Sequence, residues 1–394
     1  MRIGLICPYS LTVPGGVQNQ VMAMARSLRR RGHEARVLAP CDGAPPEPFV
    51  MPLGASVPNP ANGSIAPIAP DPAAQFRLLA ALRAEDFDLL HLHEPAVPGP
   101  CMTTVFLKPA PLVGTFHAAG EAPAYGVLAP LARWGGAQLD ARVVVSEDAL
   151  SLVEPVIDGP WITLFNGIEI EPWRDAEPWE CKTADSPPVV LFLGRHEPRK
   201  GLEVLLSALG HIDTEVRIWV AGEGDSTDAL KASHPDPRIE WLGRIDDTER
   251  ERRMAAADVF CAPSLGGESF GIILLEAMAA GTPVVASAIP GYEKVATAPG
   301  PDGTVPSEPT ARLFAPGDPV ALAGALVEVL GSASERDRLR VAGELRAAAF
   351  DMEALVDRYE DIYADVLRNA AGGSVRAGGP RLRRAGGSGE RAAG

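Results

Sequence analysis

Residues Gly266 to Glu276 read G-G-E-S-F-G-I-I-L-L-E, a Gly-rich turn that runs into an apolar helical pattern ending near Ala280. Two carboxylates, Glu268 and Glu276, lie in this stretch with seven residues between them. If the helix begins near Ser269, they lie about 12 Å apart along its axis. The unpaired backbone N–H groups of such a turn favour an anion. The pattern indicates a site for a diphosphate, although an ordinary amphipathic helix after a loop would also produce it.

Outward from this stretch, short apolar runs alternate with helical patterns along the chain, which is typical of a parallel sheet covered on both faces. A first helix is expected over Val17–Arg31 from its apolar spacing. Because the alternation occurs in both halves, the predicted fold class is α/β with two Rossmann-like domains. The expected strands cover residues 3–7, 34–39, 87–93, 112–117, 142–146, 162–166, 189–194, 216–221, 239–242, 259–262, 283–286 and 311–314.

Composition shifts divide the chain. We expect an N-terminal domain over residues 1–170, a linker rich in Pro and charge over 171–188, and a C-terminal domain over 189–350. A helix over 352–369 should pack its apolar face back onto the N-terminal domain. Residues 371–394 are rich in Gly, Ala and Arg and should be disordered. The basic tail suits either a solvated segment or a weak contact with anionic lipid.

The overall charge and the cysteines exclude several classes of protein. The 394 residues carry a net charge of −15, which argues against a nucleic-acid partner. Five scattered cysteines form no C-x-x-C pair, which fits a reducing cytoplasm and predicts no metal site. No apolar run approaches the roughly 20 residues that span a bilayer. The chain enters a strand pattern at once, so we expect no signal peptide.

Polar residues at strand ends are the candidate functional groups of the first half, because ligands of open parallel sheets bind beyond the carboxyl ends of strands. Gly15 and Gly16 open the first helix and would let a phosphate approach, but they do not form the dinucleotide fingerprint G-x-G-x-x-G. His91 and His93 share one strand face, and no third ligand is spaced for a metal. His117 ends a strand and should face the crevice, unless it is a structural histidine.

In the second half, Arg195 and Lys200 flank a strand-to-helix turn where both could bind one diphosphate, although a solvated charge cluster is the alternative. Asp246 and Asp247 follow another strand. One of these carboxylates could pair with the N1–H and N2–H₂ edge of guanine, or it could cap the helix expected over 248–257.

Together these motifs resemble the retaining glycosyltransferases of family four, which have a GT-B fold with an interdomain cleft. The resemblance covers about residues 1–370. It rests on P-G-G-V-Q, F-D-L-L-H-L-H-E-P, T-F-H, N-G-I, L-G-R-x-x-x-x-K-G and E-S-F-G-I-x-L-L-E. The opening of the chain and N-G-S-I-A are most similar to the actinobacterial phosphatidylinositol α-mannosyltransferases that use GDP-mannose.

The resemblance implies a role for each matching residue. It places His117, Arg195, Lys200 and Glu268 at the reaction centre, with the two cations on the diphosphate and Glu268 on sugar hydroxyls. Donor binding would also involve Gly16, Phe270, Gly271, Ile272, Glu276 and Asp247. Tyr9 and Gln18 would line the acceptor side.

The implied reaction is front-face transfer of a hexose with retention, in which fixed cations stabilise the leaving diphosphate and no metal or other cofactor is required. Domain closure about 171–188 would exclude water. The acceptor is expected to be phosphatidylinositol or a similar inositol compound. A less charged lipid or soluble acceptor is the alternative. The stretch Pro67–Pro72 has no basic residue, and the helix over 75–83 has only Arg77 and Arg83 where the family has a face rich in Lys and Arg.

Two other functions are compatible with the same motifs, a UDP-sugar 2-epimerase and a catalytically inert nucleotide-sugar binding module. The expected location is the cytoplasm, with a possible peripheral contact at the inner face of the plasma membrane. The partners would be a nucleotide sugar and a small-molecule or lipid acceptor.

Overall fold

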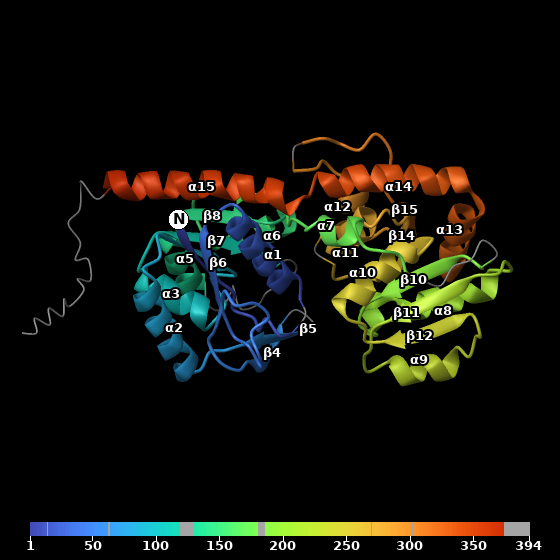
Figure 1. Ribbon diagram of the computed structural model, residues 1–394, viewed down its shortest axis with the longest axis horizontal. Helices are drawn as coiled ribbons and strands as arrows, with labels where there is room; N and C mark the ends of the chain where they lie inside the picture. Colours follow the sequence, from blue (N-terminus) through green and yellow to red (C-terminus); the bar gives the residue numbers. More distant parts are fainter. Residues whose placement is uncertain are drawn as a thin grey trace, which may run out of the picture.

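The computed structural model describes residues 1–13, 15–61, 64–118, 129–179, 186–268, 270–301 and 303–373. Within these ranges the chain forms two sheets, each made of parallel strands covered by helices on both faces, that lie side by side (Figure 1). The predicted fold class of two Rossmann-like domains is confirmed. The predicted tail over 371–394 lies outside the described residues from 374 onward.

The N-terminal sheet has the order β3-β2-β1-β6-β7-β8-β9, so the strand order reverses between β1 and β6. The carboxyl ends of the strands at such a switch point form a crevice for ligands. The elements are β1 (Arg2–Ile6), α1 (Gly16–Arg30), β2 (Glu34–Ala39), β3 (Val50–Pro52), β4 (Val57–Ala61), β5 (Ser64–Ile68), α2 (Pro72–Glu85), β6 (Leu89–His93), α3 (Pro100–Leu107), β7 (Leu112–Phe116), α5 (Ala129–Gln138), β8 (Ala141–Val144), α6 (Glu147–Val153) and β9 (Ile162–Thr163).

The C-terminal sheet has the order β12-β11-β10-β13-β14-β15, with its switch point between β10 and β13. The short helix α7 (Glu171–Arg174) precedes this sheet. The C-terminal domain comprises β10 (Val189–Leu193), η1 (Pro198–Lys200), α8 (Leu202–Ala208), η2 (Leu209–His211), β11 (Arg217–Ala221), α9 (Thr227–Ser233), β12 (Ile239–Gly243), α10 (Asp247–Ala256), β13 (Val259–Ala262), α11 (Ile272–Ala279), β14 (Val284–Ser287), α12 (Pro290–Thr297), β15 (Arg312–Phe314), α13 (Pro319–Gly331) and α14 (Ala333–Ala348). The helix α15 (Met352–Gly373) follows them in the chain.

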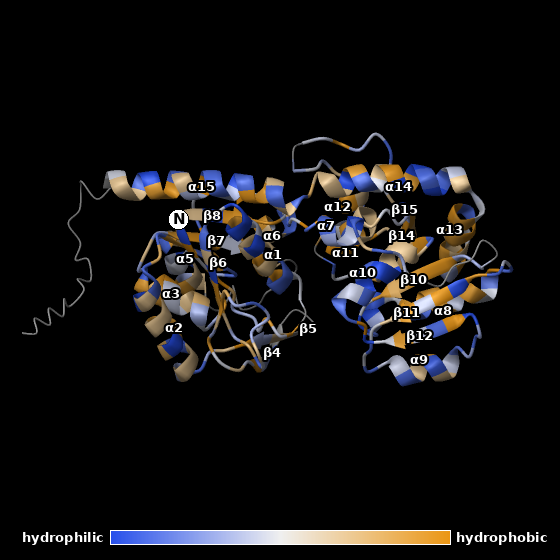
Figure 2. Ribbon diagram, viewed as in Figure 1, coloured by the Kyte–Doolittle hydropathy of each residue, from blue (hydrophilic) through white to orange (hydrophobic). Residues whose placement is uncertain are grey.

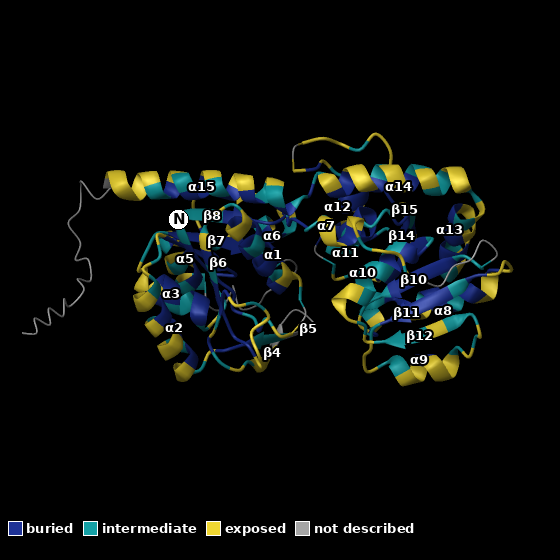
Figure 3. Ribbon diagram, viewed as in Figure 1, coloured by how far each residue is buried: buried dark blue, intermediate teal, exposed yellow. Residues whose placement is uncertain are grey.

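Buried apolar residues form cores on both faces of each sheet, as the continuous apolar strands predict. Many strand residues are coloured hydrophobic in Figure 2 and buried in Figure 3. The C-terminal helix α15 returns from the C-terminal domain and lies along the N-terminal one (Figure 1). Its buried Tyr359 and Tyr363 share a core with Met24 of α1 and Leu89 of β6. This helix therefore contributes to the hydrophobic core on one face of the N-terminal sheet.

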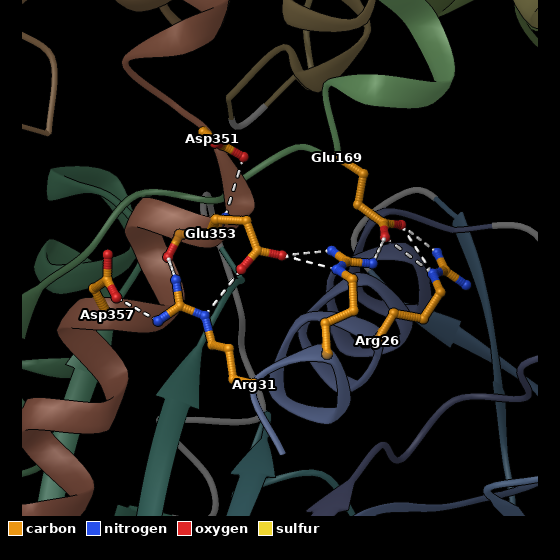
Figure 4. A network of polar contacts seen from close by, with 7 residues as sticks. Arg26, Arg31, Glu169, Asp351, Glu353 and Asp357 are labelled. Carbon is orange, nitrogen blue, oxygen red and sulfur yellow. Dashed lines mark hydrogen bonds and ion pairs between the residues drawn. The ribbon is translucent and has the colours of Figure 1, made fainter. Parts of the chain in front are cut away.

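Ion pairs also hold α15 to α1 (Figure 4). The Arg31 guanidinium lies 2.9 Å from the Glu353 carboxylate and also contacts Asp357. Arg26 is paired with Glu169, which lies just before α7. Each pair is partly exposed and contributes little alone, but several charges that share partners form a network.

Two departures from the sequence prediction concern small elements. The short strand β3 and the antiparallel pair β4–β5 were not predicted, because proline at positions 52, 58, 60 and 67 weakens a strand pattern. The predicted linker 171–188 contains α7, whose Trp173 is buried beneath the Arg250 guanidinium. Of this segment, residues 180–185 lie outside the described part of the chain.

Candidate active site

A glycine brings two loops of the C-terminal domain together at its switch point. Gly201 follows η1 with φ of +68°, and a Cβ built on it would lie only 1.9 Å from the Pro263 carbonyl oxygen. Only glycine permits both this backbone conformation and this approach. The loop that follows β10 therefore packs against the loop that follows β13, and Leu265 N–H donates to the Arg199 carbonyl at 2.8 Å.

This packing joins cations and carboxylates from the two loops. The Lys200 ammonium lies 2.5 Å from Glu268 Oε1, and the Arg199 guanidinium lies 3.2 Å from the same oxygen. Glu197 bridges Arg199 and Arg195, at 3.0 and 2.9 Å. Three cations and two carboxylates thus form one cluster with an excess of positive charge. Such a cluster suits a bound anion, because a planar guanidinium and an ammonium both donate to phosphate oxygens.

The sequence prediction named Arg195, Lys200 and Glu268 but missed Arg199 and Glu197. The structure brings the three predicted residues into one cluster through the two that were missed. A signal was present, since Arg199 precedes Lys200 in the same turn, but the sequence alone does not reveal that its side chain faces Glu268.

Helix α11 begins at Ile272, so the prediction that it begins near Ser269 is wrong. Gly271 has φ of +84°, which an α-helix does not permit, and it directly precedes the helix. A Cβ on Gly271 would lie 2.8 Å from the Tyr292 ring. Glu268 therefore lies in the loop rather than on the helix, and the separation of about 12 Å worked out for a continuous helix does not apply. Phe270 of this loop is buried.

Glu276 lies within α11 and lines a cavity between the domains together with Asp247, Arg250, Gln20 and Ile272. Burial raises the pKa of the Glu276 carboxyl, and the nearby Arg250 charge lowers it in part. The Nε atom of Arg250 is buried without a hydrogen-bond partner among the described residues. A buried donor of this kind needs an explanation, and a ligand oxygen would supply one. The sequence analysis did not select Arg250.

Two roles were expected for the pair Asp246 and Asp247, a helix cap and a contact with guanine. Asp246 caps α10, since its carboxylate accepts the Glu249 N–H at 2.8 Å. Asp247 has a side chain that is 86% exposed, so it remains accessible to a ligand. The predicted cap is therefore Asp246, and the contact between Asp247 and a ligand stays a prediction.

In the N-terminal domain, Gly16 is the first residue of α1 and is exposed. Gln18 is buried, and its amide Nε2 donates to the carbonyls of Ser10 and Val13 at 3.3 and 3.1 Å. Gln18 therefore holds the loop before α1. Tyr9 is partly buried beside Ile68 of β5, with which it forms an isolated bridge.

His117 directly follows β7 and forms a row with two buried histidines. The His93 Nδ1 and His117 Nε2 atoms lie 2.9 Å apart, and the His91 and His93 rings stack with centroids 4.4 Å apart. His91 Nδ1 contacts the Tyr363 hydroxyl of α15 at 2.7 Å. Burial lowers the pKa of His117 to about 4 and that of His91 to about 3, so both imidazoles are neutral at pH 7.

Glu94 is a buried acid beside His117 that the sequence analysis did not place in the site. Its Oε1 atom accepts the backbone N–H groups of His117 and Ala118 at 2.6 and 2.5 Å. Burial raises the pKa of Glu94 to about 7, although these two hydrogen bonds lower it in part. This carboxyl group therefore fixes the backbone at the end of β7.

The four residues expected at the reaction centre do not all lie together. Arg195, Lys200 and Glu268 meet in the C-terminal domain, whereas His117 is bound within the N-terminal one. Among the described residues, His117 shares no hydrogen bond or ion pair with Lys200 or Glu268. The cavity that Glu276 shares with Gln20 shows that the two domains meet at Glu276, but none of these four residues lines it.

The described part of the chain contains no group of three His, Cys, Asp or Glu side chains placed to hold a metal ion. None of its helices has the length and apolar character needed to cross a bilayer.

Comparison with known families adds independent information. Residues 14–171 match the model described as Glycosyltransferase Family 4, and residues 187–332 match the model described as Glycosyl transferases group 1. The boundary between the two matches lies in the segment that joins the two sheets.

Curated relatives match over almost the whole chain. The phosphatidyl-myo-inositol mannosyltransferase of Mycobacterium leprae is 37% identical over 94% of this chain and 98% of its own length. The enzyme of the same description from Mycolicibacterium smegmatis is 38% identical over 88% of both chains.

Solved structures with far lower identity share the architecture. Sucrose-phosphate synthase from Thermosynechococcus elongatus has a TM-score of 0.70 at 21% identity, over 93% of this chain and 99% of that one. Anabaena HepE, solved with UDP and glucose, has a TM-score of 0.67 at 19% identity, over 93% of this chain and 100% of that one.

Proposed function

Because the chain belongs to the family-four glycosyltransferases of GT-B fold, we propose that it transfers mannose from GDP-mannose to an inositol-type or phosphatidylinositol acceptor, with retention of configuration. The observation that carries the proposal is the cluster in which Arg199 and Lys200 share the Glu268 carboxylate. Its excess positive charge, beside the N-terminus of α11, suits a diphosphate leaving group.

Each half of the site would have its own task. Transfer builds negative charge on the departing diphosphate, and Arg195, Arg199 and Lys200 are the cations available to hold it. On diphosphate binding, Lys200 could turn from Glu268 toward phosphate, which would leave the Glu268 carboxylate for sugar hydroxyls. Glu276 would bind the ribose from α11, with Phe270, Gly271 and Ile272 offering backbone N–H groups.

The remaining predicted residues fit the same arrangement. Gly16 at the start of α1 would face the diphosphate, and a neutral His117 would lie near the anomeric carbon without repelling its positive charge. Asp247 is exposed and would meet the guanine edge. Tyr9 and Gln18 would lie on the acceptor side, with Gln18 acting through the loop that it holds.

The fixed cations would supply the charge stabilisation that a divalent metal provides in other transferases. We therefore expect transfer without an added metal, and activity in excess EDTA tests this expectation directly. We expect the protein in the cytoplasm, with a peripheral contact at the inner membrane face if the acceptor is a lipid.

A less charged acceptor is the second candidate, and one contact favours it. Arg77 of α2, one of the few cations in this region, donates to the Leu53 carbonyl at 2.7 Å and so holds the fold. It is then less available to an inositol phosphodiester.

The test is transfer of labelled mannose from GDP-mannose to phosphatidylinositol vesicles, with free inositol as a parallel acceptor. Glu268→Gln and Lys200→Ala should each lower kcat/KM at least a hundredfold, since removing one charge-stabilising group costs about 10²–10³. Arg244→Ala, at a side chain that is 85% exposed, is the control. Full turnover in Glu268→Gln and Lys200→Ala would reject the assignment.

A further inference from the structure

Three phenylalanine rings from separate segments meet at the boundary between the domains. The Phe270 ring centroid lies 5.9 Å from that of Phe165 and 5.4 Å from that of Phe350. The Phe165 and Phe350 centroids are 5.9 Å apart, so the three rings form a closed triangle. Separations of 4.5–7 Å are those of favourable aromatic pairs. Phe270 belongs to the loop between Glu268 and α11, which we call the donor loop.

The other two rings lie beside the two places where the chain passes between the domains. Phe165 follows β9, three residues before Ile168, and Phe350 lies between α14 and α15. The Ile168 N–H donates to the Phe350 carbonyl at 2.9 Å, and the Met352 N–H donates to the Ile168 carbonyl at 2.8 Å. Both crossings are therefore joined to one another directly beside the triangle.

Ion pairs fasten both crossings to α1 of the N-terminal domain (Figure 4). Glu169, on the outgoing crossing, pairs with Arg26 at 2.5 Å. Glu353, on the returning crossing, pairs with Arg31 at 2.9 Å. Rotation between the domains must therefore be taken up on the C-terminal side of these anchors, where Phe350 and the donor loop lie.

On that side, Phe350 is held by the C-terminal domain. It is buried beneath Arg346, whose guanidinium carbon lies 4.8 Å from the ring centroid. Arg346 is itself buried and donates to the carbonyls of Val295 and Lys294 at 2.7 and 2.9 Å. Phe350 thus takes its position from the C-terminal domain, although it adjoins α15.

Phe165 takes its position from the opposite domain. The next residue, Asn166, is buried and hydrogen-bonds the His117 side chain. The Gly167 N–H donates to the Gln20 side chain of α1 at 3.0 Å. A change in the angle between the domains would therefore move Phe165 relative to Phe350, and Phe270 contacts both.

We propose that the Phe165–Phe270–Phe350 triangle couples occupation of the donor loop to the angle between the two domains, with Phe165 and Phe350 acting as positioning residues. The inference rests on the proposed function, because it takes a nucleotide diphosphate as the ligand of the donor loop. A nucleotide that fixes the donor loop fixes Phe270, and the packed rings then favour one domain angle. By reciprocity, a fixed domain angle tightens nucleotide binding.

The experiment uses the full chain with GDP as the probe. Calorimetry gives the Kd of GDP, and small-angle X-ray scattering gives the radius of gyration with and without GDP. The variants are Phe165→Leu and Phe350→Leu. Phe314→Leu is the control, because it makes the same substitution at a buried residue of β15 that belongs to a different core cluster from Phe270. Melting temperatures establish that each variant is folded, and the half-buried Phe165 provides a milder variant if Phe350→Leu does not fold.

The wild-type chain should contract on binding GDP. Phe165→Leu and Phe350→Leu should weaken GDP binding two- to tenfold, the range for losing one aromatic pair, and should reduce the contraction. Phe314→Leu should leave both unchanged. If the wild-type chain binds GDP and both variants show the same Kd and the same contraction, the inference is overturned but the proposed function is not. A wild-type chain that binds neither GDP nor UDP removes the proposed function, and the inference falls with it.

Discussion

Glu94, a buried acid directly after β6, gives a prediction whose size follows from the structure. Glu94 has a pKa of about 7 in the folded chain, against 4.5 for an ordinary glutamate, because burial disfavours its charge. Between these values the folded chain binds more protons than the unfolded chain, so rising pH destabilises it. The difference between these two pKa values corresponds to about 3 kcal/mol of unfolding free energy, most of which is lost between pH 5 and 8.

Glu94→Gln removes the charge and retains an oxygen that can accept the N–H groups of His117 and Ala118. Urea unfolding of both proteins at pH 5 and pH 8 gives the difference in unfolding free energy. This difference should move in favour of the variant by about 2–3 kcal/mol as pH rises. The buried histidines titrate in both proteins and largely cancel. A difference that does not change with pH would refute the reasoning.

Three further predictions concern other parts of the molecule. Below pH 6.5 the unfolded chain protonates His91, whereas the folded chain does not until pH about 3, so the free energy of unfolding falls with falling pH. His91→Gln should reduce this slope by about 1 kcal/mol per pH unit, averaged over urea titrations at pH 5–7, and an unchanged slope would contradict the prediction. Gly201→Ala should lower the free energy of unfolding by at least about 2 kcal/mol and weaken GDP binding, because the added Cβ would meet a carbonyl oxygen. Gly210→Ala is the control, since its Cβ would enter open space, and equal melting temperatures of the two variants would argue against this prediction. Arg31→Ala should lower the unfolding free energy by about 1–2 kcal/mol at low salt, because three acids lose a shared partner, and by less at 1 M salt. An equal loss at low salt and at 1 M salt would exclude an ionic origin.

The large elements could be predicted because periodicity and burial agree along them. The apolar face expected for the C-terminal helix includes Tyr359, Tyr363 and Val366, and all three are buried in α15. Small elements were missed where local residue preferences oppose the tertiary structure. The proline-rich pair β4–β5 is one case, and the first turn of α11, displaced by Gly271, is another.

Arg195, Lys200 and Glu268, which adjoin Gly turns, do lie in one cluster, since topology alone brings strand ends together. Arg199 and Glu94 were missed for a different reason. Their partners lie 69 and 23 positions away, and only the packing of one loop on another shows which side chain meets which. The Phe165–Phe270–Phe350 contact is likewise invisible in the sequence, because each ring reads as an ordinary core residue.

Calorimetric titration of GDP-mannose into the wild-type chain and into Lys200→Ala tests the central claim most directly, since that claim is that the cations at the β10 switch point hold a diphosphate. The wild-type chain should bind, and Lys200→Ala should bind at least tenfold more weakly, with Arg244→Ala unchanged. Equal affinity in the wild-type chain and Lys200→Ala, or tight binding of mannose without the nucleotide, would contradict the account.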